Sequence, residues 1–349
     1  MKERIPVAVL GATGAVGQRI VAMVAGHPWF RLDAVGASER SAGKAYQDAA
    51  RWLLPEPMPE EARALTVRPC DPGALRQPLV FSALDADAAG PIEEAFEAAG
   101  RLVVTNARNH RMRADVPLVV PEVNGAHLDL VAGRPGAIVA NPNCSTIGLV
   151  MALAPLWERF GLEAVSVVTM QALSGAGYPG VPSMDMIDNV VPFISGEEQK
   201  LEAEPRKIFG RVTRGTVVPA ELALSASCNR VPVSDGHLLR VSVKLGARAQ
   251  RRDLEEAWTR WRGWEGARKL PSLPELALAY RSEPDRPQPR LDRDAGGGMT
   301  VSVGRLEPDS VLDYRFAALV HNTIRGAAGG TLLLAELALS RGLGSLAAV

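Results

Sequence analysis

The chain has 349 residues, more than the ~250–300 at which a single hydrophobic core usually stops growing, so we expect two domains. Lys and Arg number 39, and Asp and Glu also number 39. The resulting net charge of zero argues against a nucleic-acid or anionic-membrane partner and favours a small molecule. Three widely spaced cysteines indicate neither a disulfide framework nor a metal site, so we expect a reducing cytoplasm. Because no ~18 apolar residues run uninterrupted, we also expect no membrane-spanning helix.

The first predicted unit is a strand over residues 5–10, a glycine-rich turn and a helix. Gly11, Gly14 and Gly17 form G-x-x-G-x-x-G, a variant of the dinucleotide-binding fingerprint. Glycines at these positions allow a tight turn, close approach of a pyrophosphate and packing of the helix on the strand. The alternative is a glycine-rich helix cap without a ligand. The predicted cofactor residues of this turn are Gly11, Thr13, Gly14, Ala15, Val16 and Gly17.

The second predicted strand, residues 31–38, does not end in the Asp or Glu that would bind an adenosine ribose hydroxyl. It ends instead at Ser38, and Arg40 and Ser41 follow; the hydroxyl and guanidinium groups of these three residues suit a 2′-phosphate. This segment therefore favours NADP over NAD. The alternative is an exposed polar turn.

A further β-α-β unit follows, with strands over 79–82 and 102–105 and a helix over 86–99. Repeated units of this kind predict a doubly wound parallel sheet. Ligands of such sheets bind beyond the carboxyl ends of the strands, where Ser82 and Asn106 would lie. We expect Ser82 to contribute to the cofactor site.

Cys144 stands where a polar Asn-Pro-Asn segment meets an apolar helical pattern. Ser145 and Thr146 offer N-cap oxygens, so we expect a helix to start within a residue or two of the thiol. The helix N-terminus would then lower the thiol pKa and activate a nucleophile. From this segment alone, a small buried hydrophobic residue is an equal alternative.

The second half contains strand-like runs at 163–174, 237–245 and 297–306, which predict a mixed or antiparallel sheet. Between the first two runs lies a long Gly- and Pro-rich excursion that ends in a charged helix over 197–209. Excursions of this length are uncommon unless they bind substrate or a partner chain.

A nucleophilic cysteine needs an acid/base partner, and the chain has five histidines: His27, His110, His127, His237 and His321. His237 follows a Ser-Asp-Gly turn close to Arg230, an arrangement that resembles an anion clamp beside a general acid/base. Spacing alone does not place His237 next to Cys144.

Five motifs in this order, GATGAVG, NPNCST, SGAGYPGVPSMDMIDNVVPFISGEEQK, CNRVPVSDGH and HNTIRGAAGG, resemble the archaeal and fungal branch of the aspartate-semialdehyde dehydrogenase family. The resemblance extends from position 7 to about position 337. It implies NADPH-dependent reduction of L-aspartyl 4-phosphate to aspartate semialdehyde, by a dimer or tetramer, on the route to lysine, threonine and methionine. The implied fold is similar to that of glyceraldehyde-3-phosphate dehydrogenase.

The resemblance also implies roles for individual residues. Cys144 resembles the nucleophile that forms a thioester, His237 the acid/base and Gln171 the residue that orients the acyl group. The substrate carboxylate would pair with Arg230, and its amino group with Glu197 or the adjacent Glu198. The implied phosphate-binding residues are Arg111, Asn109 and Lys200, and Asn322 would lie near the nicotinamide.

We therefore expect an α/β protein with two parts. Residues 1–143, completed by a C-terminal helix within 322–349, would form a Rossmann-like NADP-binding domain. Residues 144–321 would form an α+β catalytic and dimerisation domain. The implied chemistry requires no metal. The rival functions are an acyl-CoA reductase, such as malonyl-CoA reductase, and a catalytically silent scaffold.

Overall fold

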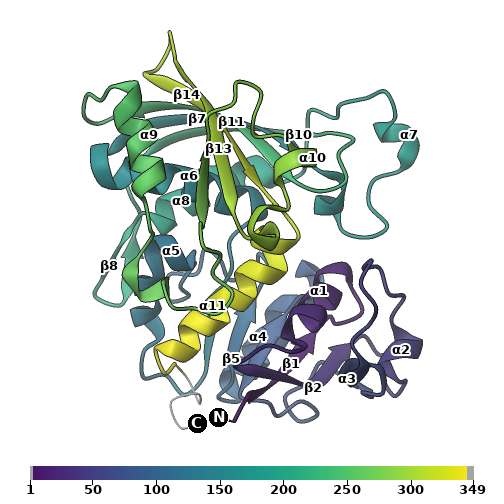
Figure 1. The fold of residues 1–349 in the computed structure, drawn as a ribbon. Coiled ribbons are helices and arrows are strands. Elements are labelled where there is room, and N and C mark those ends of the chain that lie inside the picture. Colours follow the sequence, from purple (N-terminus) through teal and green to yellow (C-terminus); the bar gives the residue numbers. More distant parts are fainter. Residues whose placement is uncertain (1–2, 344–349) are drawn as a thin grey trace.

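The computed structural model describes residues 3–343, and most of their strands belong to two six-stranded sheets. The first and last residues of the predicted cofactor domain, 1–2 and 344–349, lie outside the described range. The two sheets differ in strand direction and in the way their faces are covered. Figure 1 shows the sheet that holds β1 below the sheet that holds β11.

The first sheet is parallel throughout, with the strand order β3-β2-β1-β4-β5-β6. Its residues are mostly buried and apolar because helices cover both faces. This order is typical of dinucleotide-binding domains, and it confirms the predicted doubly wound sheet. The strands are β1 (Ile5–Leu10), β2 (Phe30–Ala37), β3 (Val67–Pro69), β4 (Leu79–Ser82), β5 (Leu102–Thr105) and β6 (Ala137–Ala140). The helices are α1 (Ala15–Val24), α2 (Tyr46–Ala49), α3 (Glu60–Arg63), α4 (Ala86–Ala98) and α5 (Pro121–Asn124).

The second sheet is mixed, with the order β10-β7-β11-β14-β13-β12, as predicted. Buried and more exposed residues alternate along two of its central strands, residues 162–171 and 237–245, as expected where one face packs on the core. The sequence did not reveal three of its strands, β10, β12 and β14. The strands are β7 (Leu162–Gln171), β10 (Ala223–Arg230), β11 (His237–Leu245), β12 (Leu278–Arg281), β13 (Val301–Pro308) and β14 (Tyr314–Val320). A separate hairpin pairs β8 (Arg211–Thr213) with β9 (Thr216–Val218).

Helix α6 (Cys144–Phe160) is the central element of the core. All its residues from 145 to 156 are buried, and its apolar side chains join a single cluster with residues of both sheets. A helix that is apolar all round is one that protein surrounds on every side. Helix α6 therefore packs against residues of both sheets.

The last described helix shares a core cluster with residues of the first sheet. Helix α11 (Gly329–Ser340), yellow in Figure 1, packs beside the parallel sheet. Its Glu336 contacts Nε2 of His27 at 2.9 Å, and both side chains are buried.

The remaining helices belong to the second half of the chain. In Figure 1 the segment around α7 projects away from the sheet at the right of the molecule. No helix within residues 3–343 is long and apolar enough to cross a membrane. These helices are α7 (Ser183–Met186), α8 (Glu197–Ile208), α9 (Arg251–Arg260) and α10 (Pro289–Asp292).

Candidate active site around Cys144

Cys144 is the first residue of α6, which confirms a helix start beside the thiol. The predicted cap is wrong, however. The side chain of Asn143 accepts hydrogen bonds from the backbone N–H groups of Ser145 at 2.9 Å and Thr146 at 3.3 Å. Because Asn143 already stands at the cap position, the hydroxyls of Ser145 and Thr146 fall within the first turn and have no hydrogen-bond partner among the described residues.

The thiol of Cys144 is not activated in the way the sequence predicts. Burial and the carboxylate of Glu197 raise its pKa to about 12, although the side chain keeps some exposure. The charges of Arg111 and Lys200 and the N–H of Ser145 act in the opposite direction without reversing the shift. The free protein therefore holds a protonated thiol at neutral pH, beside two cations that would stabilise its anion.

Glu197 is the first residue of α8, and three side chains donate hydrogen bonds to it near the nucleophile. Its carboxylate accepts hydrogen bonds from Lys200 at 2.6 Å, from the amide of Asn143 at 3.0 and 3.1 Å, and from Gln171 at 3.2 Å. Burial alone would raise the pKa of Glu197, but Lys200, Asn143 and Gln171 together hold it below its ordinary value. Glu197 is therefore a buried carboxylate that remains ionised.

The structure separates Glu197 from its neighbour. Glu198 accepts a hydrogen bond from the backbone N–H of Cys228 at 3.1 Å and so faces strand β10. Of these two acidic residues, Glu197 is the one whose carboxylate lies in the Asn143 network.

Three strands of the second sheet end or begin beside this network. Gln171 ends β7, Arg230 ends the parallel neighbour β10 at the paired position, and His237 begins the antiparallel neighbour β11. Strand pairing thus places three predicted residues, separated by up to 66 positions, at one end of the sheet.

The peptide groups of Ala172 fix two of these side chains. Its carbonyl accepts a hydrogen bond from Nη1 of Arg230 at 2.6 Å, and its N–H donates to Nδ1 of His237 at 3.0 Å. A Cβ atom on Gly175 would lie 2.8 Å from Nη1 of Arg230 and 3.1 Å from Nε2 of His237. Both side chains therefore border the same glycine, as an anion clamp beside an acid/base would require.

The contact with Ala172 determines the tautomer of His237. Because Nδ1 accepts a hydrogen bond, the neutral ring carries its hydrogen on Nε2, which has no protein partner among the described residues. Burial, reinforced by the charge of Arg230, lowers the pKa of His237 to about 3. At neutral pH the ring is an uncharged hydrogen-bond donor at Nε2.

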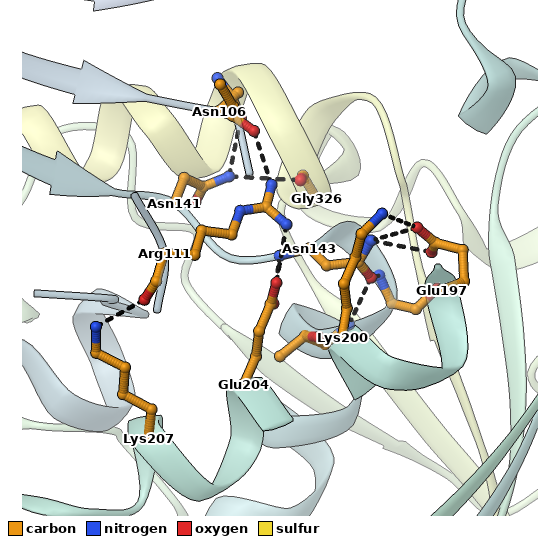
Figure 2. A network of polar contacts seen from close by, with 12 residues as sticks. Asn106, Arg111, Asn141, Asn143, Glu197, Lys200, Glu204, Lys207 and Gly326 are labelled. Carbon is orange, nitrogen blue, oxygen red and sulfur yellow. Dashed lines mark hydrogen bonds and ion pairs between the residues drawn. The ribbon is translucent and has the colours of Figure 1, made fainter. Parts of the chain in front are cut away.

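Arg111 lies on the other side of the nucleophile loop, in the network of Figure 2. Its guanidinium donates to Glu204 at 3.0 Å and to the carbonyl of Asn106 at 2.7 Å. Lys207 donates to the backbone carbonyl of Arg111 at 2.6 Å. The predicted Asn109 does not join this network. It is exposed, and its amide donates to the carbonyl of Ala86 at the start of α4.

The glycine turn fits the prediction of a dinucleotide site. Gly11 has a φ of 68°, and a Cβ there would come within 2.5 Å of the carbonyl oxygen of Ala83. A Cβ on Gly17 would come within 2.2 Å of the carbonyl oxygen of Gly11, so α1 packs directly on the turn. Thr13, Gly14, Ala15 and Val16 remain at least partly exposed around the N-terminus of α1.

A cleft of about 270 Å³ begins at this turn and is lined by both domains. Ala15 and Arg19 line it from α1, and Ser174 and Thr323 line it from the second half. Asn322 directly precedes Thr323 in the sequence. Its side chain accepts a hydrogen bond from the N–H of Gly236 and donates to the hydroxyl of Ser174. Asn322 thus ties together two loops next to the cleft.

The other predicted cofactor residues differ in accessibility. Ser38 and Arg40 are exposed and Ser41 is half-buried, in a turn that follows β2 next to the glycine turn. Ser82, in contrast, is fully buried and donates to Glu93 at 2.6 Å. The hydroxyl of Ser82 therefore belongs to the interior beneath the strand ends and does not face the glycine turn as an exposed donor.

Sequence reasoning missed Glu204 and Lys207. Both lie on α8, seven and ten positions after Glu197, so the four side chains Glu197, Lys200, Glu204 and Lys207 follow one helical face. That spacing was the available signal. Within residues 3–343, no group of three or more His, Cys, Asp or Glu side chains is arranged to hold a metal ion.

Comparisons with known proteins agree with this architecture. The family model "Semialdehyde dehydrogenase, NAD binding domain" matches residues 6–131, and "Semialdehyde dehydrogenase, dimerisation domain" matches residues 153–325. The aspartate-semialdehyde dehydrogenase of Archaeoglobus fulgidus is 47% identical over 340 residues, which cover 96% of this chain and 98% of the relative. That of Candida albicans is 48% identical over 352 residues, covering 94% and 96%. A crystal structure of the Candida albicans enzyme with NADP has a TM-score of 0.91 at 45% identity and covers 97% of this chain and 99% of that one.

Proposed function

Because this chain belongs to the aspartate-semialdehyde dehydrogenase family, in agreement with the predicted resemblance, we propose that it reduces L-aspartyl 4-phosphate to L-aspartate 4-semialdehyde with NADPH. One observation carries the proposal. Cys144 begins a buried helix directly after Asn143, which donates to Glu197 and to Glu204. Glu197 accepts from Lys200, and Glu204 accepts from Arg111, so both cations are held beside the nucleophile. A thiol between two cations and a carboxylate suits a substrate that has a phosphate and an amino group.

Substrate recognition falls to the side chains at the end of the second sheet. The guanidinium of Arg230 would pair with the α-carboxylate, and the ionised carboxylate of Glu197 with the α-amino group. Gln171, which contacts Glu197, would orient the acyl group. These assignments follow the family resemblance, and the shared contact of Glu197 and Gln171 supports them.

Thioester formation follows from the placement of the cations. The sulfur of Cys144 attacks the acyl carbon and a C–S bond forms, while the bond from that carbon to the phosphate oxygen breaks and the thiol proton passes to the departing phosphate. Phosphate then leaves toward Arg111 and Lys200. The same two cations stabilise the thiolate as it forms.

His237 stabilises negative charge on the substrate oxygen. When bound, NADPH supplies the hydride that reduces the thioester. The Nε2–H of His237 would donate to the resulting oxyanion, which collapses to the aldehyde and returns the thiolate. A base role at Nδ1 would first require loss of the hydrogen bond from Ala172. The structure therefore supports a donor role more strongly than the predicted acid/base role.

The glycine turn and its neighbours would hold the cofactor. A Cβ on Gly11 or Gly17 would collide with backbone atoms, which fits a turn shaped for close approach of a pyrophosphate. Ser38, Arg40 and Ser41 would bind the 2′-phosphate of NADP. Asn322 and the cleft beside it would hold the nicotinamide end.

We also propose that residues 1–143 with the C-terminal helix form the cofactor domain, and that 144–321 form the catalytic domain. We further propose that the protein acts in the cytoplasm as a homodimer or homotetramer. The projecting segment around α7 supports the assembly. Its large apolar side chains are more than half exposed, as expected for an interface. They are Tyr178, Met184, Ile187, Val190 and Phe193.

Light scattering after size-exclusion chromatography tests this assembly. Phe193→Ser should shift the mass toward the monomer, whereas Val311→Ser, at an even more exposed site on the β13–β14 turn, should not. An unchanged mass for Phe193→Ser at micromolar and nanomolar concentration would exclude this segment from the interface.

Parallel assays test the activity. We expect NADPH formation from aspartate semialdehyde, inorganic phosphate and NADP, and no NADPH consumption with malonyl-CoA. The second arm tests the acyl-CoA reductase alternative, which the close relatives do not favour. Turnover of malonyl-CoA without phosphate-dependent oxidation of the semialdehyde would overturn the proposed function.

A further inference from the structure

Glu204 contacts both Arg111 and Asn143, the residue before the nucleophile. Its side chain is 2% exposed. One carboxylate oxygen accepts a hydrogen bond from Nη1 of Arg111 at 3.0 Å, and the other accepts the backbone N–H of Asn143 at 2.8 Å (Figure 2). Asn143 precedes the nucleophile and caps its helix. A single buried carboxylate thus connects the phosphate-binding candidate to the nucleophile loop.

We propose that Glu204 is a positioning residue that sets Arg111 relative to Cys144 for phosphate binding, an inference that rests on the proposed function. Each oxygen of a buried carboxylate needs a donor, because an unpaired buried charge is strongly unfavourable. Glu204 meets this need with one donor from each side. Displacement of either partner would therefore leave the carboxylate half-satisfied, which holds both partners in place.

Arg111 keeps donors for a ligand despite its protein contacts. A guanidinium has five N–H groups. One on Nη1 serves Glu204 and one on Nη2 serves the carbonyl of Asn106, whereas Nε is buried without a partner among the described residues. The side chain is thus fixed in orientation but not saturated, as a preformed oxyanion site requires.

Lys207 supports the same arrangement from the next turn of α8. Its ammonium donates to three backbone carbonyls, those of Arg111 and Arg113 at 2.6 Å and that of Val116 at 2.8 Å. The helix therefore holds the backbone of the Arg111 loop through Lys207 and its guanidinium through Glu204.

Asn143 is held from two sides by the same helix. Glu197 accepts from its side-chain amide, and Glu204 accepts from its backbone N–H. Glu197 is also a candidate contact for the substrate, but Glu204 has both oxygens engaged by protein. Glu204 therefore acts through its partners and not on the substrate itself.

The test is Glu204→Gln, assayed in the direction that consumes inorganic phosphate. The new amide has one oxygen that accepts and one NH₂ group that donates. Because Arg111 and the N–H of Asn143 are both donors, the NH₂ group would face one of them and that hydrogen bond would be lost. We expect the KM for phosphate to rise on the order of tenfold or more, as for loss of a charged hydrogen bond. The KM for aspartate semialdehyde and the Kd for NADP should stay within about twofold. Glu202→Gln is the matched control, since Glu202 lies on the same helix and its carboxylate accepts the N–H of Ala226 from strand β10, away from Arg111 and Asn143.

A double-variant cycle separates positioning from general destabilisation. In an Arg111→Ala background, Glu204→Gln should leave the phosphate KM unchanged, because the residue it positions is absent. Additive effects, an unchanged phosphate KM in the single variant, or equal changes in all three constants would overturn the inference. If Glu204→Gln does not fold, Glu204→Asp retains the charge and should raise the phosphate KM selectively, to a smaller extent. Wild-type enzyme without phosphate-dependent turnover would instead refute the proposed function.

Discussion

The cofactor turn and the surroundings of Cys144 are built in opposite ways. The turn comes from seven consecutive residues, Gly11 to Gly17, and backbone sterics determine its shape. The surroundings of Cys144 come from segments spread over more than 120 positions of the chain, from Arg111 to His237, and side-chain charges and hydrogen bonds determine their shape.

This difference decides what each region tolerates. A steric turn responds to added volume, because the atoms that a new Cβ would meet belong to the backbone and cannot move aside. A buried polar cluster responds to changes of charge or of donor number, even at constant volume. The following predictions probe these two sensitivities.

The largest expected effect is at the nucleophile. Cys144→Ser should lower kcat by about 10⁴-fold or more while the Kd for NADP stays nearly unchanged, because a serine hydroxyl is a far poorer nucleophile than a thiolate. Steady-state kinetics and fluorescence titration with NADPH measure the two quantities. Cys70→Ser, a free cysteine of the first domain, is the control and should retain substantial activity at saturating NADP. Near-normal turnover of the Cys144 variant would contradict the covalent mechanism.

The next effect concerns the turn. Gly11→Ala should destabilise the protein by roughly 3 kcal/mol or more, because the residue has a φ of 68° and its Cβ would lie 2.5 Å from the carbonyl oxygen of Ala83. Gly26→Ala separates the two causes, since Gly26 has a φ of 74° but an added Cβ would meet no atom within 4 Å. Its loss should be only about 1 kcal/mol. Chemical denaturation gives both values, and equal losses would show that sterics do not determine the turn.

The same contrast explains what the sequence could predict. Local patterns located the strands over 5–10, 79–82, 102–105 and 237–245 and the glycine turn, because buried periodicity and glycine chemistry are local properties. The cap at Asn143 was missed because Asn143, Ser145 and Thr146 could each have served, and only the backbone decides among them.

Long-range properties were predicted less well from the residues themselves. The thiol pKa was wrong in direction because burial and Glu197, 53 positions away, outweigh the helix start. The burial of the Ser82 hydroxyl was not predicted, because its partner Glu93 comes from the following helix. The approach of Gln171, Arg230 and His237 required strand pairing that no spacing reveals. Only the family resemblance brought these residues together beforehand.

A smaller effect tests the electrostatics around the thiol. Because the pKa of Cys144 is raised to about 12, the thiolate fraction of the free enzyme should grow about tenfold per pH unit throughout the range below that value. Alkylation by iodoacetamide, followed at Cys144 by mass spectrometry, should accelerate accordingly from pH 7 to about 9.5. Glu197→Gln removes the nearby negative charge and should speed alkylation at every pH. A plateau below pH 8.5 would show that the helix N-terminus and the two cations dominate after all.

The smallest expected effect is at the exposed edge of the cofactor region. Arg40 lies in the exposed turn after β2. Its guanidinium could bind the 2′-phosphate through two parallel N–H groups, which the hydroxyls of Ser38 and Ser41 could not do. Arg40→Ala should therefore lower kcat/KM for NADP roughly tenfold, a modest loss because solvent screens an exposed charge pair. The value for NAD, which lacks the 2′-phosphate, should change little. Glu39→Ala is the control, since it alters the same exposed turn without removing a cation. Equal losses for NADP and NAD would remove Arg40 from cofactor selection and leave the specificity to the hydroxyls of Ser38 and Ser41.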